Sequence, residues 1–190
     1  EIFKIGVPTM VFQLLTSLAS VLINMQSREF GDSVIAGMGA ATRIISMGSL
    51  MVFGFMKGFQ PIAGYSYGAG DYDRLKEAIW TSVIWSTAFC VIFGLSAAVF
   101  SDYFVSCFTS GDTQMLSIGV GSLRASGLSF VLFGFYTVYS SLYLALGKAA
   151  KGFSLGACRQ GICFVPIILI LPVCVGKGGI IYAQPIADIL

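Results

Sequence analysis

The 190 residues are 56% hydrophobic and only 11% charged, and the mean hydropathy is +0.87. A soluble domain carries roughly 25% charged residues, so this composition excludes a soluble globular protein and indicates a lipid bilayer as the solvent. The formal net charge is +2 and the chain has no Lys/Arg-rich run, which argues against nucleic acid as a partner. Because histidine is absent, catalysis by histidine and metal sites built from histidine are excluded.

Long apolar segments follow one another along the chain, separated by short turns rich in Gly and Asp. A membrane-spanning helix needs about 20 predominantly apolar residues. By this criterion the sequence predicts helices at 5–27, 33–67, 78–101, 113–147, 152–175 and 178–190. We therefore expect an all-α, polytopic transmembrane helix bundle of six antiparallel helices. Because the sequence ends within the sixth apolar segment, we expect a fragment of a longer protein with its last helix truncated.

Basic residues near the helix ends predict the orientation in the membrane, because they are enriched on the cytoplasmic side. With a cytoplasmic N-terminus, five basic residues lie at cytoplasmic ends and two on the opposite side. The five are Lys4, Arg74, Lys76, Lys148 and Lys151, and the two are Arg28 and Lys177. We expect a multi-pass protein of the cytoplasmic (inner) membrane with its N-terminus inside.

The first predicted helix carries a stripe of polar residues. Gln13, Ser17, Ser20 and Asn24 follow one another at helical spacing, so they share one face. Polar groups at membrane depth need partners, which are supplied by neighbouring helices or by a wet cavity. The stripe is thus a candidate substrate-cavity wall, with hydrogen bonding between helices as the structural alternative.

The fourth predicted helix carries an aromatic stripe made of Ser129, Phe133, Tyr136, Tyr139 and Tyr143. Such a face can hold flat, cationic or apolar ligands by stacking and cation–π attraction. Packing, with interfacial anchoring near Tyr143, is the structural alternative. Tyr136 and Tyr139 are the two residues of this stripe that we predict as substrate-cavity candidates.

Charged residues within the apolar spans are further candidates, because a charge at the bilayer centre is costly. Arg43 and Arg124 lie near helix ends and could reach the membrane surface. Lys57, Arg159 and Asp188 are the intramembrane candidates for a transport role, and Asp188 is the one acidic residue deep in an apolar run. Without a second carboxylate in the spans, this chain offers a poor ion site.

The five cysteines fall in or beside apolar runs and form no CxxC pair. They are therefore expected to be small buried hydrophobic residues rather than ligands of a zinc site or members of a disulfide framework. Catalytic residues, metal sites and cofactors are not expected.

A specific resemblance begins in the second predicted helix. Residues 58–70, GFQPIAGYSYGAG, resemble the Q-P-[IV]-x-G-Y-[NS]-[YW]-G-A segment of multidrug and toxic compound extrusion (MATE) transporters. Further segments resemble the family in order along the chain: residues 4–8, 41–44, 145–149, 159–160 and 185–188. The resemblance covers nearly the whole chain and implies the C-terminal six-helix lobe of a two-lobe transporter.

The resemblance also implies roles. Members export a small-molecule substrate from a cavity between two lobes in exchange for H⁺ or Na⁺. The expected partners of the chain are therefore membrane lipid, the N-terminal lobe and the substrate. The segment's signature residues are Gln60, Pro61, Gly64, Tyr65 and Gly68. We expect them to shape the lobe and its gate, because small residues permit close helix approach and Gln60 can satisfy backbone groups freed by Pro61.

Two departures from the family pattern qualify these roles. Lys57 stands where the family often has a neutral polar residue, and the fourth predicted helix lacks the acidic residue that some branches use for coupling. The coupling ion is therefore expected to bind mainly in the N-terminal half.

The predicted function is export of drugs, organic cations or other amphipathic molecules by H⁺ or Na⁺ antiport. A flippase or exporter of lipid-linked or polysaccharide precursors is the alternative, which Lys57 and Arg159 favour. An intramembrane enzyme is disfavoured, because the chain has no histidine, no carboxylate pair and no GxSxG motif.

Overall fold

The structure is a computed structural model that describes residues 2–28, 31–109 and 112–147, together with residues 152, 166–168, 179 and 186. Every element in the three long described ranges is a helix. The helices are α1 (Ile2–Arg28), α2 (Asp32–Gly68), α3 (Tyr72–Val99), α4 (Ser101–Ser106) and α5 (Thr113–Ala145). The predicted helices at 152–175 and 178–190, with Arg159 and Asp188, lie outside these ranges.

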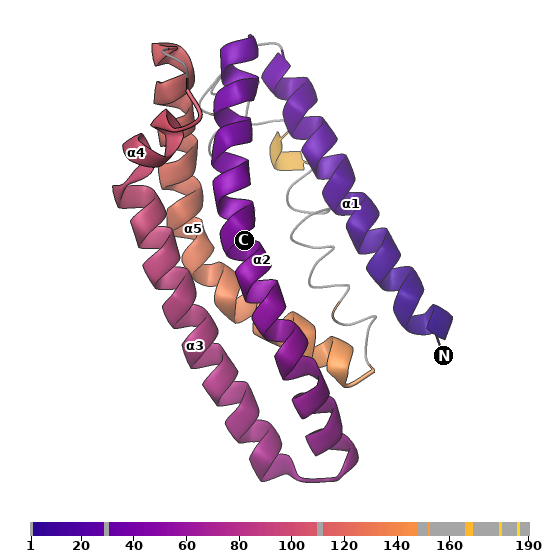
Figure 1. Ribbon diagram of the computed structural model, residues 1–190. Helices are drawn as coiled ribbons and strands as arrows, with labels where there is room; N and C mark the ends of the chain where they lie inside the picture. The colour runs from indigo at the N-terminus through magenta and orange to yellow at the C-terminus, as the bar shows by residue number, and fades with distance from the viewer. Residues whose placement is uncertain are drawn as a thin grey trace.

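The centre of the bundle is formed by α2, α3 and α5. As Figure 1 shows, these three long helices run side by side, and α5 bends as it passes behind α2. Helix α5 packs against both α2 and α3, and the short α4 sits between α3 and α5. Helix α1 contacts the N-terminal part of α2, where Ala19 joins Val34 and Met38 in one apolar cluster.

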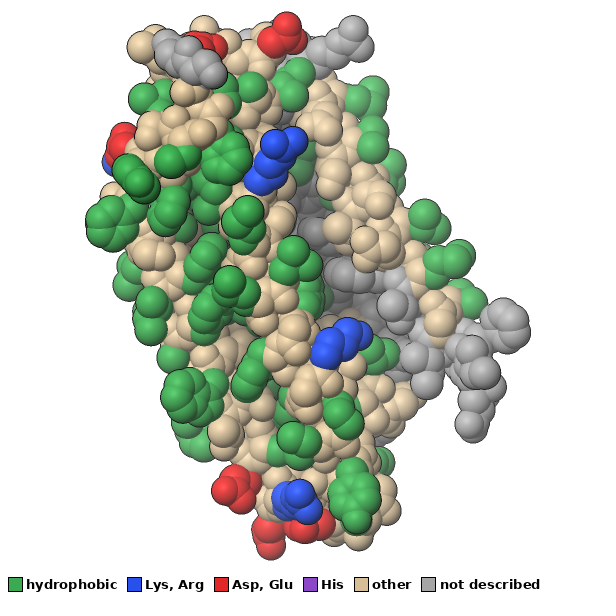
Figure 2. All heavy atoms as spheres, in the orientation of Figure 1, with side chains coloured by type: hydrophobic (Ala, Val, Ile, Leu, Met, Phe, Trp, Pro, Cys, Tyr) green, Lys and Arg blue, Asp and Glu red, His purple; other side chains and the backbone are tan. Residues whose placement is uncertain are grey.

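Three of these helices are long and apolar enough to cross a membrane: α2, α3 and α5. Many of their large apolar side chains, including Leu50, Trp85, Ile92 and Leu132, are exposed in the chain as described. Figure 2 shows such side chains spread along the flanks of the bundle rather than gathered in one patch. This distribution is typical of helices that face lipid, where apolar surface needs no cover.

The start of α3 differs from the prediction. The helix begins at Tyr72, whereas the charge-free run predicted a start near residue 78. Asp71 caps the first turn by accepting a hydrogen bond from the backbone N–H of Arg74 at 3.0 Å. Gly70, with φ of 73°, makes the preceding turn. A charge-free criterion detects only the apolar part of a helix, so it missed this polar first turn.

Helix α4 was not predicted. The third apolar run was expected to continue to residue 101, but α3 ends at Val99 and a separate short helix follows it. Phe100, with φ of −94° and ψ of 21°, lies between them. Hydrophobicity is continuous across this break, so the apolar pattern could not reveal it.

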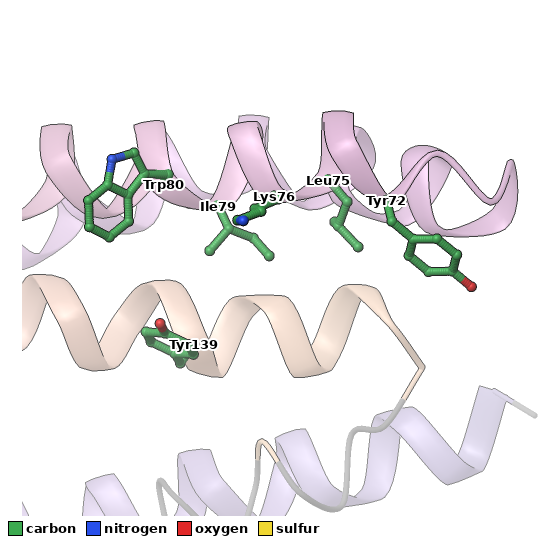
Figure 3. A pocket seen from close by; sticks show the side chains of 6 residues that line it. All are labelled: Tyr72, Leu75, Lys76, Ile79, Trp80 and Tyr139. Atoms are coloured by element: carbon green, nitrogen blue, oxygen red, sulfur yellow. The ribbon is translucent and has the colours of Figure 1, made fainter.

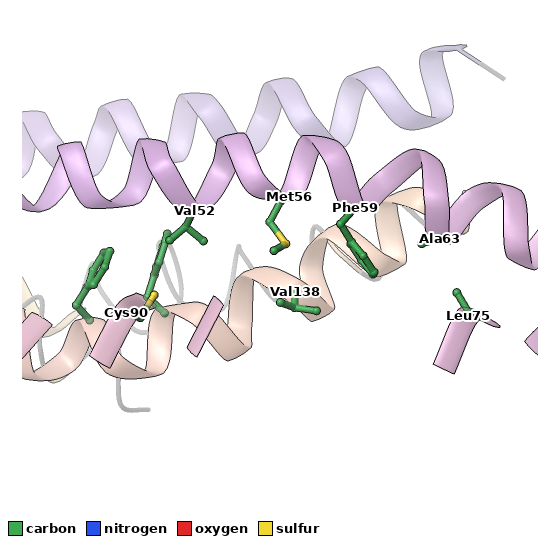
Figure 4. Packing of buried hydrophobic residues seen from close by; sticks show 9 residues of the cluster. Val52, Met56, Phe59, Ala63, Leu75, Cys90 and Val138 are labelled. Atoms are coloured by element: carbon green, nitrogen blue, oxygen red, sulfur yellow. The ribbon is translucent and has the colours of Figure 1, made fainter. Parts of the chain in front are cut away.

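The bundle is held together by apolar clusters in which α2 meets its neighbours. In the larger one, Val52, Met56 and Phe59 of α2 pack against Cys90 of α3 and Val138 of α5. Figure 4 shows these side chains converging between the helices. Such packing fixes the side of α2 that faces inward and leaves its opposite side uncovered.

Candidate functional site

The polar stripe of α1 faces away from the bundle. Gln13, Ser17, Ser20 and Asn24 are all exposed, whereas Ala19 on another side of the helix is buried in the core. Ser20 donates from Oγ to the carbonyl oxygen of Thr16 at 3.1 Å, within its own helix. None of the four forms a hydrogen bond with another described helix. The stripe is therefore open to whatever covers this face from outside the described bundle.

The outward face of α2 carries both basic residues of that helix. Arg43 and Lys57 are exposed, and 14 residues separate them, close to four helical turns. They therefore share one side of α2, about 21 Å apart along its axis. Figure 2 shows basic side chains over α2 on the side turned to the viewer, with acidic side chains confined to the region near the two ends.

Arg43 and Lys57 have no ion pair with any carboxylate of the described residues. The salt bridge that the structure records lies elsewhere, between Arg124 Nη2 and Asp102 Oδ2 at 2.7 Å. Arg124 also donates from Nε to Ser101 Oγ at 2.9 Å. Arg124 thus joins α5 to α4 instead of entering the candidate site.

The aromatic stripe of α5 splits into a packed part and a peripheral part. Ser129 and Phe133 are buried, and the Phe133 ring stacks on Phe130 with centroids 5.1 Å apart. Phe133 also meets Phe53 of α2 edge-on at 5.7 Å. Tyr136 is half-buried and lies 6.5 Å from the Phe133 ring. Through Phe133, this part of the stripe packs α5 against α2.

Tyr139 lies in a groove between α3 and α5, shown in Figure 3. The groove has a volume of about 300 Å³, and the other residues that line it are Tyr72, Leu75, Lys76, Ile79 and Trp80 of α3. Trp80 and Tyr72 are exposed beside the charged first turns of α3, which is the setting of an interfacial aromatic belt. The structure therefore places Tyr139 apart from the polar stripe of α1.

The signature residues of α2 lie along its C-terminal third. Pro61 is exposed and the helix continues through it to Gly68. Gly64 approaches the end of α5, since a Cβ there would lie 3.5 Å from the carbonyl oxygen of Ala145. Tyr65 is exposed. Gln60 is half-buried and forms no hydrogen bond among the described residues, so the hydrogen bond expected between Gln60 and the backbone near Pro61 is not found among them.

The turn after α2 depends on Gly70 rather than on Gly68. A Cβ at Gly68 would meet nothing within 4 Å, so no close approach requires glycine there. The positive φ that favours glycine occurs at Gly70.

Metal and thiol chemistry receive no support in the described part of the chain. No group of three or more Cys, Asp or Glu that could hold a metal ion occurs among the described residues. Cys90 is buried as expected, but Cys107, at the end of α4, is exposed, so the expectation of burial is wrong for it. Cys158, Cys163 and Cys174 lie outside the described residues.

The sequence analysis did not predict that Arg43 and Lys57 lie on the same side of one helix. Their spacing of 14 residues is a signal that was available, since it returns to the same side of a helix after four turns. Which side of α2 faces outward was not available from spacing, because large apolar residues lie on several sides of this helix.

Comparison with known proteins gives one family. The sequence model of the MatE family matches residues 8–170. The chain is 24% identical over 190 residues to the multidrug export protein MepA of Staphylococcus aureus (strain MRSA252), covering all of this chain and 42% of that protein. It is also 24% identical to the MepA protein of Staphylococcus haemolyticus, of which it covers 41%.

Solved structures agree in fold. A mutant of the Vibrio cholerae MATE transporter VcmN matches with a TM-score of 0.91 and 21% identity, over 98% of this chain and 42% of that one. The MATE multidrug transporter DinF-BH, solved with a bound ligand, matches with a TM-score of 0.86 and 31% identity, over 99% of this chain and 42% of that one. The chain therefore spans about 42% of the length of these relatives.

These matches confirm the predicted all-α membrane fold and the predicted family resemblance. Members of the MatE family are membrane transporters rather than enzymes. A match to the family model over 163 of the 190 residues, from residue 8 to residue 170, is well over half of the chain, and on that basis the chain belongs to the MatE family.

Proposed function

We propose that the chain is the C-terminal lobe of a two-lobe secondary transporter that exports amphipathic small molecules, such as drugs, across the cytoplasmic membrane. The observation that carries the proposal is open polar surface on two helices. The polar stripe of α1 and the basic residues of α2 are exposed, although both helices pack elsewhere in the bundle. In a membrane, such a polar surface needs protein, water or substrate against it.

The second lobe would supply the opposite wall of the cavity. Rocking of two helical lobes about a site between them is a common way to alternate access in secondary transporters. The substrate would then meet the α1 stripe from Gln13 to Asn24, while Gly64 and its neighbours keep α2 and α5 closely packed at one end. The Gln60–Gly68 segment would shape the gate in this arrangement.

Export would be driven by H⁺ or Na⁺ antiport. Ion coupling usually requires a carboxylate at membrane depth. The acidic residues of the described ranges all lie in caps or in the first two turns of a helix, namely Asp32, Asp71, Asp73, Glu77, Asp102 and Asp112. We therefore place the ion site mainly in the N-terminal lobe.

A second candidate is export of lipid-linked or polysaccharide precursors by the same two-lobe movement. Exposed Lys57 and Arg43 favour it, because the phosphates of such precursors need cationic partners. This candidate shares the fold and the cavity and differs in the substrate.

Efflux in cells tests the proposal. A pump-deficient bacterium that makes the intact protein should export ethidium, and the export should stop with a proton uncoupler or with removal of sodium. In the same assay, Ser17→Leu should reduce export several-fold because it fills the polar stripe. Leu18→Met, on an exposed apolar side of the same helix, is the matched control and should leave export unchanged.

Absence of drug efflux from a correctly inserted protein would contradict drug export and leave the precursor exporter as the favoured function. Equal loss in both variants would show that the stripe has no special role.

A further inference from the structure

The groove between α3 and α5 is a cavity that the proposed transport function does not use. Its volume of about 300 Å³ lies at the lower end of the range for ligand pockets. In Figure 3, Leu75 and Ile79 point from α3 toward the helix that carries Tyr139. Lys76 lines the same groove, so its apolar and aromatic walls hold one cation.

The groove lies where α3 changes from charged to apolar sequence. The first six residues, Tyr72 to Glu77, include four charged ones, whereas the remaining 22, Ala78 to Val99, include none. A helix of that apolar length spans about 33 Å, close to the thickness of the hydrocarbon core of a bilayer. The charged turns therefore lie at one membrane surface, at the level of the lipid headgroups, with exposed Trp80 beside them.

Two carboxylates flank Lys76 on the surface of α3. Asp73 lies three residues before Lys76 and four before Glu77, so both are its neighbours on the helix. Trp80 follows Lys76 by four residues and Glu77 by three, which places it in the same group. Arg74 is two residues from Lys76 and faces another direction. The three charged members of the group are exposed, and none forms an ion pair within the described residues.

This charge pattern matches a headgroup that carries both signs. A lysine in a groove between membrane helices suits a phosphate, while the two carboxylates accept hydrogen bonds from an ammonium group. A primary ammonium group offers three N–H donors, and the face of Trp80 attracts it as well. A quaternary ammonium group has no N–H to donate. A purely anionic headgroup would meet two carboxylates for each lysine and would be repelled.

An apolar row leads from the charged turns toward the centre of the bilayer. Lys76, Trp80 and Ile84 follow one another at spacings of four residues, over about 12 Å of α3. Trp80 and Ile84 are 68% and 51% exposed. An acyl chain attached to a headgroup at Lys76 has the length and the chemistry to lie along this row.

We propose that the groove between α3 and α5 binds a phospholipid whose headgroup carries a primary ammonium group. The phosphate binds Lys76, the ammonium group binds Asp73 and Glu77, and one acyl chain lies over Trp80 and Ile84. The site requires that α3 span the membrane, and it does not depend on which substrate the transporter exports.

Native mass spectrometry of the purified intact protein tests the proposal through the first lipid that stays bound. Dioleoyl phosphatidylethanolamine and dioleoyl phosphatidylcholine share the phosphate and the chains, but only the former has a primary ammonium group. In direct competition, the ethanolamine lipid should be retained at least about threefold more, because hydrogen bonds between charged groups are strong.

The variants separate the two parts of the headgroup. Asp73→Asn combined with Glu77→Gln should abolish the preference, whereas Lys76→Gln should weaken the binding of both lipids. Neither acid caps α3, since Asp71 does so, and an unchanged melting temperature in detergent would confirm that the double variant is folded. Arg74→Gln is the matched control. Arg74 is exposed in the same turns but faces another direction, so its loss should leave the preference unchanged.

Several outcomes would overturn the site. The unmodified protein alone decides against it if it retains the two lipids equally, or if it retains dioleoyl phosphatidylglycerol, which is anionic and has no ammonium group, more strongly. A preference that survives in the double variant would place the lipid elsewhere on the protein. An equal loss of preference in Arg74→Gln would show a general effect of charge. Displacement of the bound lipid by glycerophosphoethanolamine, which has no acyl chains, would contradict a phospholipid as the ligand.

Discussion

Asp112 joins two helices at the end of the bundle where α5 begins. Its Oδ1 accepts hydrogen bonds from the backbone N–H groups of Gln114 and Met115 at 2.9 and 3.3 Å, which caps α5. Its Oδ2 accepts a hydrogen bond from Ser33 Oγ of α2 at 2.6 Å. One carboxylate therefore both starts α5 and ties it to the first turn of α2.

These contacts make the stability of this junction depend on pH. The hydrogen bond from Ser33 is the main reason that the pKa of Asp112 lies below its usual range, followed by the bond from Met115. A lowered pKa in the folded state means that the stabilisation is present above the unfolded-state pKa and is lost as pH falls through the folded-state pKa. Asp112→Asn should therefore lower the melting temperature of the intact protein at neutral pH.

The difference in melting temperature between Asp112→Asn and the unmodified protein should shrink as the medium is acidified. Ser33→Ala removes the main cause of the shift and should reproduce part of the loss at neutral pH. Thermal unfolding in detergent across acidic and neutral pH measures both effects. A difference that does not change with pH would contradict the role of the ionised carboxylate.

Arg124 and Asp102 make a short contact whose contribution should still be small. Their side chains are 55% and 66% exposed, so solvent or headgroups screen the pair. A double-mutant cycle with Arg124→Gln and Asp102→Asn should give a coupling free energy below about 1 kcal/mol. A coupling of several kcal/mol in thermal or denaturant unfolding would show that this pair is not screened as its exposure indicates.

At the scale of the helices, the close packing of α5 depends on glycines. Gly119, Gly127 and Gly134 are all buried, and each lies where α5 meets a neighbour. A Cβ at Gly127 would lie 2.7 Å from the carbonyl oxygen of Gly94 in α3, and one at Gly134 would lie 2.9 Å from that of Ser86. In a membrane, small residues allow backbones to approach where apolar burial adds little.

Gly127→Ala should therefore destabilise the bundle by about 1–3 kcal/mol, because the added methyl group meets a backbone atom that cannot rotate away. Gly54→Ala is the matched control. Its Cβ would enter open space, and alanine favours a helix over glycine by about 1 kcal/mol, so stability should stay equal or rise. Denaturation of the two variants in detergent compares them. Equal behaviour would mean that α3 and α5 separate easily at this contact.

At the scale of the whole molecule, the connections fall at two opposite ends of the bundle. Figure 1 shows the turn between α2 and α3 at one end, and α4 with the start of α5 at the other. With the proposed cytoplasmic N-terminus, the first turns of α3 with Arg74 and Lys76 lie inside and α4 lies outside. The excess of Lys and Arg at the inner ends is the basis of this orientation.

Cysteine labelling tests the orientation. Cys107 is exposed at the end of α4, so a membrane-impermeant maleimide added to whole cells should label it. Cys90 is buried in the core between α2, α3 and α5 and should stay unlabelled in the folded protein. The signal should disappear in a Cys107→Ser variant. Labelling of Cys107 only after the cells are opened would reverse the proposed orientation.

The sequence by itself determined the membrane class, the positions of the long apolar segments and the family. These properties follow from local composition and from motifs in order, because a bilayer demands long apolar runs whatever their neighbours are. It also singled out Gln13–Asn24 and Lys57. The sequence did not predict the polar first turn of α3, which the Asp71 cap begins, or the break before α4, where the backbone changes direction at Phe100. It also predicted burial for Cys107, which is exposed at the end of α4.

Only the tertiary structure decided which side of each helix faces inward. The aromatic stripe of α5 and the polar stripe of α1 were equal candidates by spacing, yet Phe133 packs into the core while Ser17 and Asn24 stay open. In a membrane the inward and outward sides of a helix are both apolar, so periodicity distinguishes them weakly. Contacts between helices that are remote in sequence determine which side faces inward. As a result, Lys57 and Arg43 both lie on the exposed side of α2.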